Sequence, residues 1–213
     1  MSLMEAVAWV AGEPHSYHPK CVSPVIGDFL DTLEFCSNAE ERQKLKRFIP
    51  KLIGTAASDA VELRRSWMAL DWTVRVLAPA WLRLADFDAE ADALEALAEI
   101  DGILTFKAAR DTIREACFHA EDARRATWDP ATDWDEWNQA VWVGFHGAWE
   151  AARTAADDVW LKDADYALDA TLGAAATVWS TAGEDGLRPT RDHLQREAMT
   201  LAERMIAVTS DAA

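Results

Sequence analysis

The chain has 213 residues, half of them hydrophobic, which is enough for one domain with a buried core and argues against disorder. No run of about eighteen apolar residues occurs, so the sequence predicts no membrane-spanning helix. Because the first residues, MSLMEAVAWVAGEP, lack the basic start and apolar length of a signal peptide, we expect a cytoplasmic protein. Its three scattered cysteines are too few for a disulfide framework, which agrees with a reducing compartment.

The net charge of −16 at pH 7 is the strongest constraint on partners. Proteins bind nucleic acid largely through lysine and arginine side chains that displace counterions from phosphates, so direct nucleic-acid binding is not expected. The acidity is concentrated in residues 86–101 and 129–169. Such stretches are typical of a solvated surface, although they can also receive a basic protein. The sequence therefore predicts a protein partner and allows that partner to be basic.

Residues 4–11 form the first predicted helix, with Trp9 on its inner side and Gly12 at its end. An irregular loop follows over residues 12–24, which contain three prolines and a glycine. Pro24 is suited to open a helix over residues 25–35. The buried side of that helix should carry Ile26, Phe29, Leu30 and Leu33.

Ser37 and Glu40 have the spacing of a capping box, which predicts a helix from this point to Phe48. This segment holds the one strongly basic stretch of the chain. Its basic residues are Arg42, Lys44, Lys46, Arg47 and Lys51.

The central helix is expected over residues 58–84, with Ser58 as its N-cap. At about 100° per residue, its side chains form two apolar flanks with a polar stripe between them, so the helix should pack on both sides. Pro79 should kink or restart the helix, because it lacks an amide donor and disfavours the α region for Ala78. One flank holds Leu63, Trp67, Leu70, Val74 and Leu77; the other holds Val61, Met68, Trp72 and Val76; the stripe holds Arg64, Asp71 and Arg75; and Asp59, Glu62, Ser66 and Thr73 lie opposite.

Two helices are predicted after the central one. Asp86 or Asp88 should cap a helix over residues 89–98. A longer helix is expected over residues 105–127. Its buried side should carry Phe106, Ile113, Cys117 and Ala120.

An alanine- and tryptophan-rich pattern then runs from residue 134 to 179, with a break expected near Lys162. The sequence GEDGLRP at 183–189 should end that block, and Thr190 should cap a last helix that reaches residue 208. No alternating apolar run indicates a strand. The sequence thus predicts an all-α fold: a single-domain multi-helix bundle of about eight helices over residues 1–213, with a long alanine-rich C-terminal helical block.

The polar stripe of the central helix is the first candidate site. Asp71 and Arg75 have the i, i+4 spacing of a helical ion pair, and Arg64 lies on the same stripe. Trp67 and Trp72 flank the carboxylate, which would lose hydration there and should need an arginine partner. Two interpretations stay open: a buried structural ion pair, or a binding site built on Asp71.

The proline loop holds a second candidate. His15, His18 and Cys21 form an H-x2-H-x2-C pattern, and Cys36 could supply a fourth ligand. Zinc binds two imidazoles and two thiolates tetrahedrally, so a zinc site is possible here, although the sequence as a whole predicts no cofactor. The spacing lacks the paired form of familiar zinc modules, and the alternative is a loop that is simply packed by its own side chains.

A third candidate arises if the helices on either side of a turn at 129–133 pack antiparallel. Glu115 and His119 would then lie at the height of Glu150 and His146, as in metal sites of helical bundles. Their positions around the helices favour solvent-facing ion pairs instead.

Tryptophan is unusually frequent, with eleven in the chain. Trp128, Trp134 and Trp137 lie close to the acidic turn at 129–133. Exposed tryptophans beside carboxylates can stack a sugar, a cationic ligand or an arginine of a partner, whereas packing in the core or at its rim is the simpler interpretation.

A family resemblance rests on three stretches: HPKCVSPVIGDFL at 18–30, RRSWMALDWTVRVLAPAWLRLA at 64–85 and LRPTRDHLQREAMTLAERMI at 187–206. With them the chain resembles an uncharacterised family of alanine- and tryptophan-rich helical proteins from actinobacteria and actinobacteriophages. The resemblance spans most of the chain. It implies one helical domain in the cytoplasm of a bacterium or of a phage-infected cell, and no activity.

We therefore expect a non-enzymatic acidic helical protein that binds another macromolecule, as an adaptor, an inhibitor or an immunity-type neutraliser. This expectation rests on the charge and on the lack of Walker, GxGxxG, GxSxG and HExxH motifs in the sequence. The alternative is a metal-dependent enzyme or small-ligand binder that uses the His15, His18 and Cys21 loop or the Asp71 region.

Overall fold

The computed structural model describes residues 1–35, 37–127 and 158–209, and within these ranges every regular element is a helix. This confirms the predicted all-α fold, a single compact helical domain. No helix in the same ranges is both long and apolar enough to cross a membrane. The helices are α1 (Leu3–Ala11), α2 (Pro24–Phe35), α3 (Ala39–Leu45), α4 (Ile49–Leu52), α5 (Asp59–Trp72), α6 (Ala78–Leu84), α7 (Asp88–Glu95), α8 (Ile103–Thr127) and α11 (Asp158–Ala207), with a 3-10 turn at Lys46–Phe48 and a π-helical turn at Thr73–Leu77.

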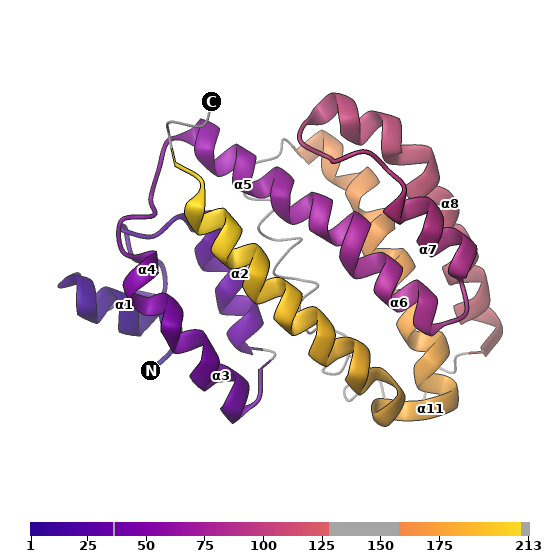
Figure 1. The fold of residues 1–213 in the computed structure, drawn as a ribbon, viewed down its shortest axis with the longest axis horizontal. Coiled ribbons are helices and arrows are strands. Elements are labelled where there is room, and N and C mark those ends of the chain that lie inside the picture. Colours follow the sequence, from indigo (N-terminus) through magenta and orange to yellow (C-terminus); the bar gives the residue numbers. More distant parts are fainter. Residues whose placement is uncertain (36, 128–157, 210–213) are drawn as a thin grey trace.

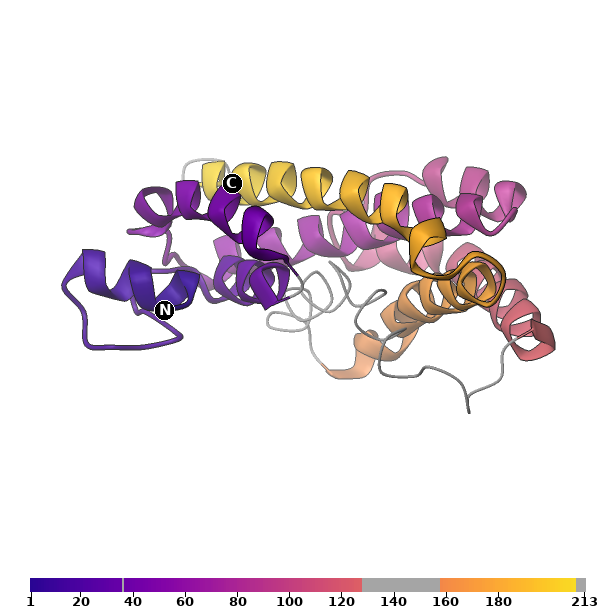
Figure 2. The same cartoon turned by 90° about the horizontal axis from the view of Figure 1, so that it is seen from below.

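The central helix forms one long rod from α5 through the π turn to α6 (Figure 1). Helix α11 has two arms: an N-terminal arm, residues 158–182, and a C-terminal arm, residues 184–207. The C-terminal arm lies alongside the rod in both views (Figures 1 and 2), with α2 and α3 beyond it. Helices α7 and α8 and the N-terminal arm gather around the α6 end of the rod. Both halves of the bundle therefore pack on the stretch that the sequence marks as central.

Helix α1 has the predicted end but not the predicted inner side. It ends at Gly12, whose left-handed φ of 72° suits glycine. Trp9 is 76 % exposed, so the prediction that it lies inside is wrong. The helix packs on α2 and α4 through the side that carries Met4 and Val7, and Trp9 lies about 200° around the helix from Val7.

Helix α3 begins one residue later than the sequence predicts. Its N-cap is Asn38, whose Oδ1 accepts hydrogen bonds from the backbone N–H groups of Glu40 and Glu41 at 2.9 and 3.0 Å. Ser37 is buried and donates its hydroxyl to the carbonyl of Leu33, at the C-terminal end of α2. The predicted capping box of Ser37 and Glu40 is therefore wrong, and Asn38 and Glu41 form one instead.

Pro79 does not stop the central helix, because a π turn precedes it. The backbone N–H of Ala78 donates to the carbonyl of Thr73, five residues back, and Ala78 keeps right-handed helical angles of −60° and −46°. A proline ring inside a regular helix clashes with the carbonyl four residues earlier, and the wider π turn relieves that clash. The predicted restart at Pro79 is thus a local change of helix type, and the expected bias of Ala78 away from the α region is wrong.

The side of the central helix opposite the polar stripe is buried. Glu62, Ser66 and Thr73 are all largely removed from solvent. The hydroxyls of Ser66 and Thr73 each donate to a carbonyl four residues earlier, at 3.1 and 2.9 Å, so they need no water. Leu63, by contrast, is 40 % exposed although the pattern places it on an apolar flank.

Helix α7 packs against α6 with Ala91 and Leu94 buried, and exposed ion pairs also join the two helices. Its N-cap is Phe87, with no side-chain hydrogen bond there, so the predicted cap by Asp86 or Asp88 is wrong. Arg83 of α6 instead reaches the carboxylates of Asp92 and Glu95 at 2.6 and 2.7 Å. Asp86 turns the chain with a left-handed φ of 64°.

Helix α8 packs against the N-terminal arm of α11 at very short range. A Cβ added to Gly173 would lie 2.8 Å from the backbone carbonyl carbon of Ala120, so only glycine fits at this crossing. The predicted buried side of α8, with Phe106, Ile113, Cys117 and Ala120, is confirmed. Small residues in the alanine-rich block thus allow two helices to approach closely.

The kink in α11 lies at Gly183, with φ 61° and ψ −158°, which are angles open mainly to glycine. The predicted break in this region is confirmed, but the helix resumes at once and carries Pro189 within it. Thr190 is therefore not an N-cap. The break expected near Lys162 is also wrong, because α11 runs through that residue.

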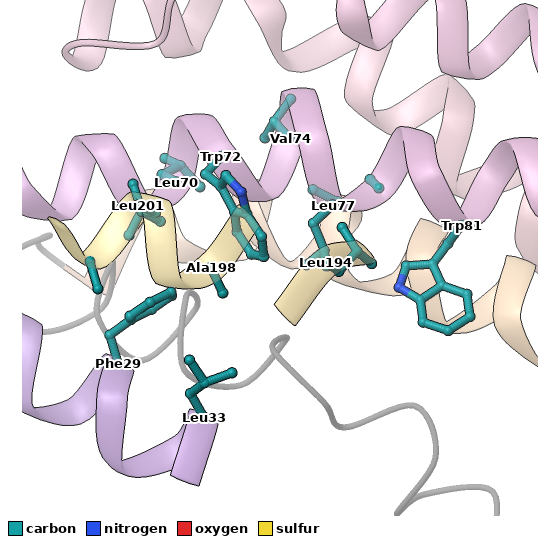
Figure 3. Close-up of a cluster of buried hydrophobic side chains, with 14 of the residues drawn as sticks. Phe29, Leu33, Leu70, Trp72, Val74, Leu77, Trp81, Leu194, Ala198 and Leu201 are labelled. Atoms are coloured by element: carbon teal, nitrogen blue, oxygen red, sulfur yellow. The ribbon is translucent and has the colours of Figure 1, made fainter. Parts of the chain in front are cut away.

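The core joins the central rod to α2 and to the C-terminal arm (Figure 3). Phe29 and Leu33 of α2 lie below the rod in this view, while Leu194, Ala198 and Leu201 come from the C-terminal arm. Trp72 meets Phe29 edge to face, with ring centroids 6.3 Å apart. The predicted buried side of α2 is thereby confirmed.

Candidate functional site

Asp71 is a structural anchor between two segments. Its carboxylate accepts from Arg75 Nη1 at 3.1 Å, which confirms the predicted i, i+4 pair, and from the backbone N–H of Ile100 at 2.8 Å. The side chain of Asp71 is 16 % exposed and that of Arg75 is 29 % exposed. Arg64 is exposed, and the carboxylate is held by Arg75 and the backbone of Ile100. The structure therefore uses Asp71 to tie the α7–α8 loop to the central helix.

The two tryptophans proposed around Asp71 pack within the bundle. Trp67 is partly buried, and its ring centroid lies 6.3 Å from that of Phe106 on α8. Trp72 is buried, and its indole Nε1 meets no hydrogen-bond acceptor among the described residues.

Arg75 lines a shallow hollow of about 530 Å³ together with Arg83, Glu95, Pro189 and His193, among others.

The buried charge of the central helix is Arg65, which the sequence pattern did not single out. Its guanidinium is 2 % exposed and pairs with Glu62 at 2.9 Å. It also donates to three backbone carbonyls, those of Thr55, Met205 and Val208, at 2.7, 3.1 and 3.0 Å. Burial lowers the pKa of this guanidinium below its ordinary value, and Glu62 opposes that shift.

This cluster, here called the Arg65 clamp, holds the C-terminal end of α11. The last carbonyls of a helix have no partner within the helix, so a buried helix end needs donors from elsewhere. Arg65 supplies them to Met205 and Val208, and Ser23 donates its hydroxyl to the carboxylate of Glu62. The sequence shows the i, i+3 spacing of Glu62 and Arg65. It does not show which of the two adjacent arginines, Arg64 or Arg65, is buried.

The proline loop is held by two glutamates. His15 Nε2 lies 2.6 Å from Glu5, while His18 lies 3.9 Å from Asp28. The carboxylate of Glu13 accepts from the backbone N–H groups of Lys20 and Cys21 at 2.7 and 2.9 Å. The bond from Lys20, more than any other contact, lowers the pKa of Glu13.

The proposed zinc ligands have separate surroundings. Burial, and then Glu13, raises the pKa of the Cys21 thiol. Cys36 lies outside the described residues, so the four-ligand arrangement stays a prediction. Over residues 1–35, 37–127 and 158–209, no three His, Cys, Asp or Glu side chains are grouped so that they could hold a metal ion.

The other candidates fall partly outside the described residues. The structure does not describe two residues of the proposed bundle site, His146 and Glu150. It also does not describe the tryptophans near the acidic turn, Trp128, Trp134 and Trp137. His119 of α8 is exposed and its Nδ1 lies 2.6 Å from Glu90 of α7. Glu115 is also exposed.

A hollow lies between α3 and the C-terminal arm of α11, and we call it the α3–α11 groove. It has a volume of about 880 Å³. One wall follows the arm from Arg188 to Thr200, and the other follows the end of α2 and α3. Its lining is Leu33, Ser37, Asn38, Glu40, Glu41, Lys44, Leu45, Arg47, Arg188, Arg191, Asp192, Gln195, Arg196, Met199 and Thr200.

The groove is basic in an otherwise acidic molecule. Five of its side chains are basic and three are acidic, whereas the whole chain carries −16. Part of the basic stretch that the sequence singled out, Lys44 and Arg47, lies in one wall. Three arginines of the other wall come from a distant part of the chain, so the sequence alone could not show the groove.

Comparisons with protein-family models, with curated proteins and with solved structures find no match to this chain. The resemblance to actinobacterial and actinobacteriophage proteins therefore stays a prediction.

Proposed function

We propose that this protein is a non-enzymatic interaction protein that binds another protein through the α3–α11 groove. The observation that supports this best is the groove itself, a hollow of about 880 Å³ between two helices that is lined mainly by charged and polar side chains. A channel between helices is a common way to receive a peptide segment or a helix of a partner.

The dimensions of the groove suit a short segment. Arg188 and Thr200 are twelve residues apart on one helix, which corresponds to about 18 Å at 1.5 Å per residue. An extended peptide of about six residues covers that length. Leu45 and the partly buried Met199 provide apolar surface within the channel, and charged side chains provide selectivity.

Under this proposal the protein acts as an adaptor, inhibitor or neutraliser in the cytoplasm. A basic partner remains a prediction for the acidic surface outside the groove. The alternative function, a metal-dependent enzyme or small-ligand binder at the His15, His18 and Cys21 loop or the Asp71 region, is tested by elemental analysis of the purified protein. Stoichiometric zinc or iron would favour that alternative.

Site-specific crosslinking tests the proposed function. A photoreactive phenylalanine analogue at Thr200, an exposed groove residue, should give one discrete crosslinked protein in cells that naturally produce this chain. The same analogue at Leu104, which is exposed on α8, is the control and should not give that product. The identified protein, once purified, should bind the full chain in isothermal titration calorimetry. Identical products from the two positions, or no calorimetric binding, would contradict the proposal.

A further inference from the structure

We propose that the α3–α11 groove recognises an acidic segment, rich in aspartate and glutamate, of its partner protein. This inference rests on the proposed function and adds the chemistry of the partner. It is carried by three features of the groove: its local charge, an arginine with no ion-pair partner, and a buried amide with no acceptor.

The acids in the groove are already engaged at one end. Glu41 caps α3 through the backbone N–H of Asn38 at 2.7 Å, and Glu40 pairs with Lys44 at 3.1 Å. Both residues belong to the first turn of α3. The rest of the channel carries Arg47 and the arginines of the C-terminal arm, with Asp192 as its one acid. Arg188 and Arg47 are paired with Asp185 and Glu203, which lie outside the lining, and Arg191 lies 3.9 Å from Asp192. The excess positive charge that meets an entering carboxylate is therefore centred on Arg196.

Arg196 is the residue best placed to meet a carboxylate. It is exposed, lines the groove and has no ion-pair partner in the part of the chain that the structure describes. A guanidinium presents paired N–H donors that match the two oxygens of a carboxylate. Arg47, in the 3-10 turn that follows α3, pairs with Glu203 of the C-terminal arm at 3.2 Å.

Gln195 gives a second and independent indication. Its side chain lines the groove and is only 7 % exposed, yet its buried Nε2 donates to no acceptor among the described residues. Buried polar groups in proteins are nearly always hydrogen-bonded, so an amide donor in this position calls for an acceptor from outside. Both a carboxylate oxygen and a peptide carbonyl are such acceptors, and an acidic peptide carries both.

The negative charge of the rest of the molecule disfavours long polyanions, such as nucleic acids, as ligands of the groove. Fixed charges act over a screening length of about 8 Å in physiological salt, so the groove and the acidic regions of the molecule act largely separately. A nucleic acid would continue beyond the groove, which is about 18 Å long by helix rise, over a chain whose net charge is −16. A short acidic peptide ends within the basic channel. The geometry thus favours a protein segment.

The test uses three fluorescein-labelled six-residue peptides, the length that the groove covers. The first carries Glu and Asp between Gly, Ser and Leu spacers, the second has Gln and Asn in place of the acids, and the third has phosphoserine as its only acid. Binding to the full chain is measured by fluorescence anisotropy. We expect the carboxylate peptide to bind about tenfold more tightly than its amide form, with the difference reduced at high salt.

Two groove variants and one matched control complete the experiment. Arg196→Glu should lower the affinity for the carboxylate peptide about tenfold, whereas Arg110→Glu, the same charge change on α8, should not. Gln195→Leu should weaken binding without lowering the melting temperature, because a donor with no acceptor contributes nothing to folding. If Gln195 were only structural, the melting temperature would fall and the affinity would not.

The inference is overturned if the carboxylate and amide peptides bind equally, if neither binds, if the phosphoserine peptide binds more tightly, or if Arg196→Glu has no effect. Failure of the proposed function is distinguishable from these results. A protein crosslinked at Thr200 through a segment without acids would leave the proposed function standing and refute the acidic segment. Loss of both the crosslink and the peptide binding would refute both.

Discussion

Replacing Arg65 should be among the most destabilising single changes in this protein. The residue is 2 % exposed and makes four charge-assisted hydrogen bonds, one to Glu62 and three to backbone carbonyls. Removing one partner of a buried ion pair costs about 3 to 5 kcal/mol, because the other charge stays buried without compensation. Arg65→Met keeps much of the side-chain volume, so the cost comes from lost hydrogen bonds rather than from a cavity. We expect the free energy of unfolding to fall by about 4 kcal/mol, a large part of the 5 to 15 kcal/mol typical of a domain.

Urea unfolding followed by circular dichroism measures this change. Arg64→Met is the matched control, since Arg64 is the adjacent arginine and is exposed, and it should change the unfolding free energy by less than about 0.5 kcal/mol. The double variant Glu62→Leu with Arg65→Met should recover about half of the loss, because it removes the stranded carboxylate but leaves carbonyls without donors. An Arg65→Met variant as stable as the Arg64→Met control would show that the clamp does not form.

Three further predictions concern other packed residues. Asp71→Ala leaves Arg75 and the backbone N–H of Ile100 without their acceptor. Because the pair is partly exposed, we expect the free energy of unfolding in urea to fall by about 2 kcal/mol. A fall of less than about 0.5 kcal/mol would instead make Asp71 a candidate binding residue. Gly173→Ala should lower the free energy of unfolding by about 1 to 3 kcal/mol despite the higher helix propensity of alanine, because the new Cβ meets the backbone of α8. A stabilised variant would refute that close approach. Burial raises the pKa of the Cys117 thiol to about 12. Iodoacetamide at pH 8 should therefore alkylate Cys117 far more slowly in the native protein than in urea, which mass spectrometry can measure. Equal rates would mean that the thiol is accessible in the native protein.

The sequence predicted most of the helices because their apolar spacing and their end signals agree. Pro24 and Gly12 mark the ends of helices as expected, and the buried side of α8 follows directly from its period. Errors arose where tertiary packing decides. Trp9 is large and apolar, but α1 docks through its other side, and Ser37 bonds back to α2 instead of capping α3.

The candidate sites show the same limit more sharply. Helical spacing alone predicted the pair of Asp71 and Arg75, because both residues lie on one helix. The Arg65 clamp joins the central helix to carbonyls about 140 residues later in the chain, as its bonds to Met205 and Val208 show. No local pattern in the sequence specifies contacts over that distance, and the same holds for the two walls of the α3–α11 groove.

The clamp and the groove share one element, the C-terminal arm of α11, and this makes scaffold and site separable by experiment. The arm is fixed at its end by Arg65 and is tied to the α3–α4 segment by Glu203, which pairs with both Arg47 and Lys51. A loosened arm would displace one wall of the groove, so Arg65→Met should weaken peptide binding as well as stability. Gln195→Leu and Arg196→Glu change only side chains within the groove and should affect binding while leaving stability nearly unchanged. If all three variants instead lowered stability and binding in proportion, the groove would be a structural seam of the bundle, and its binding role would be refuted.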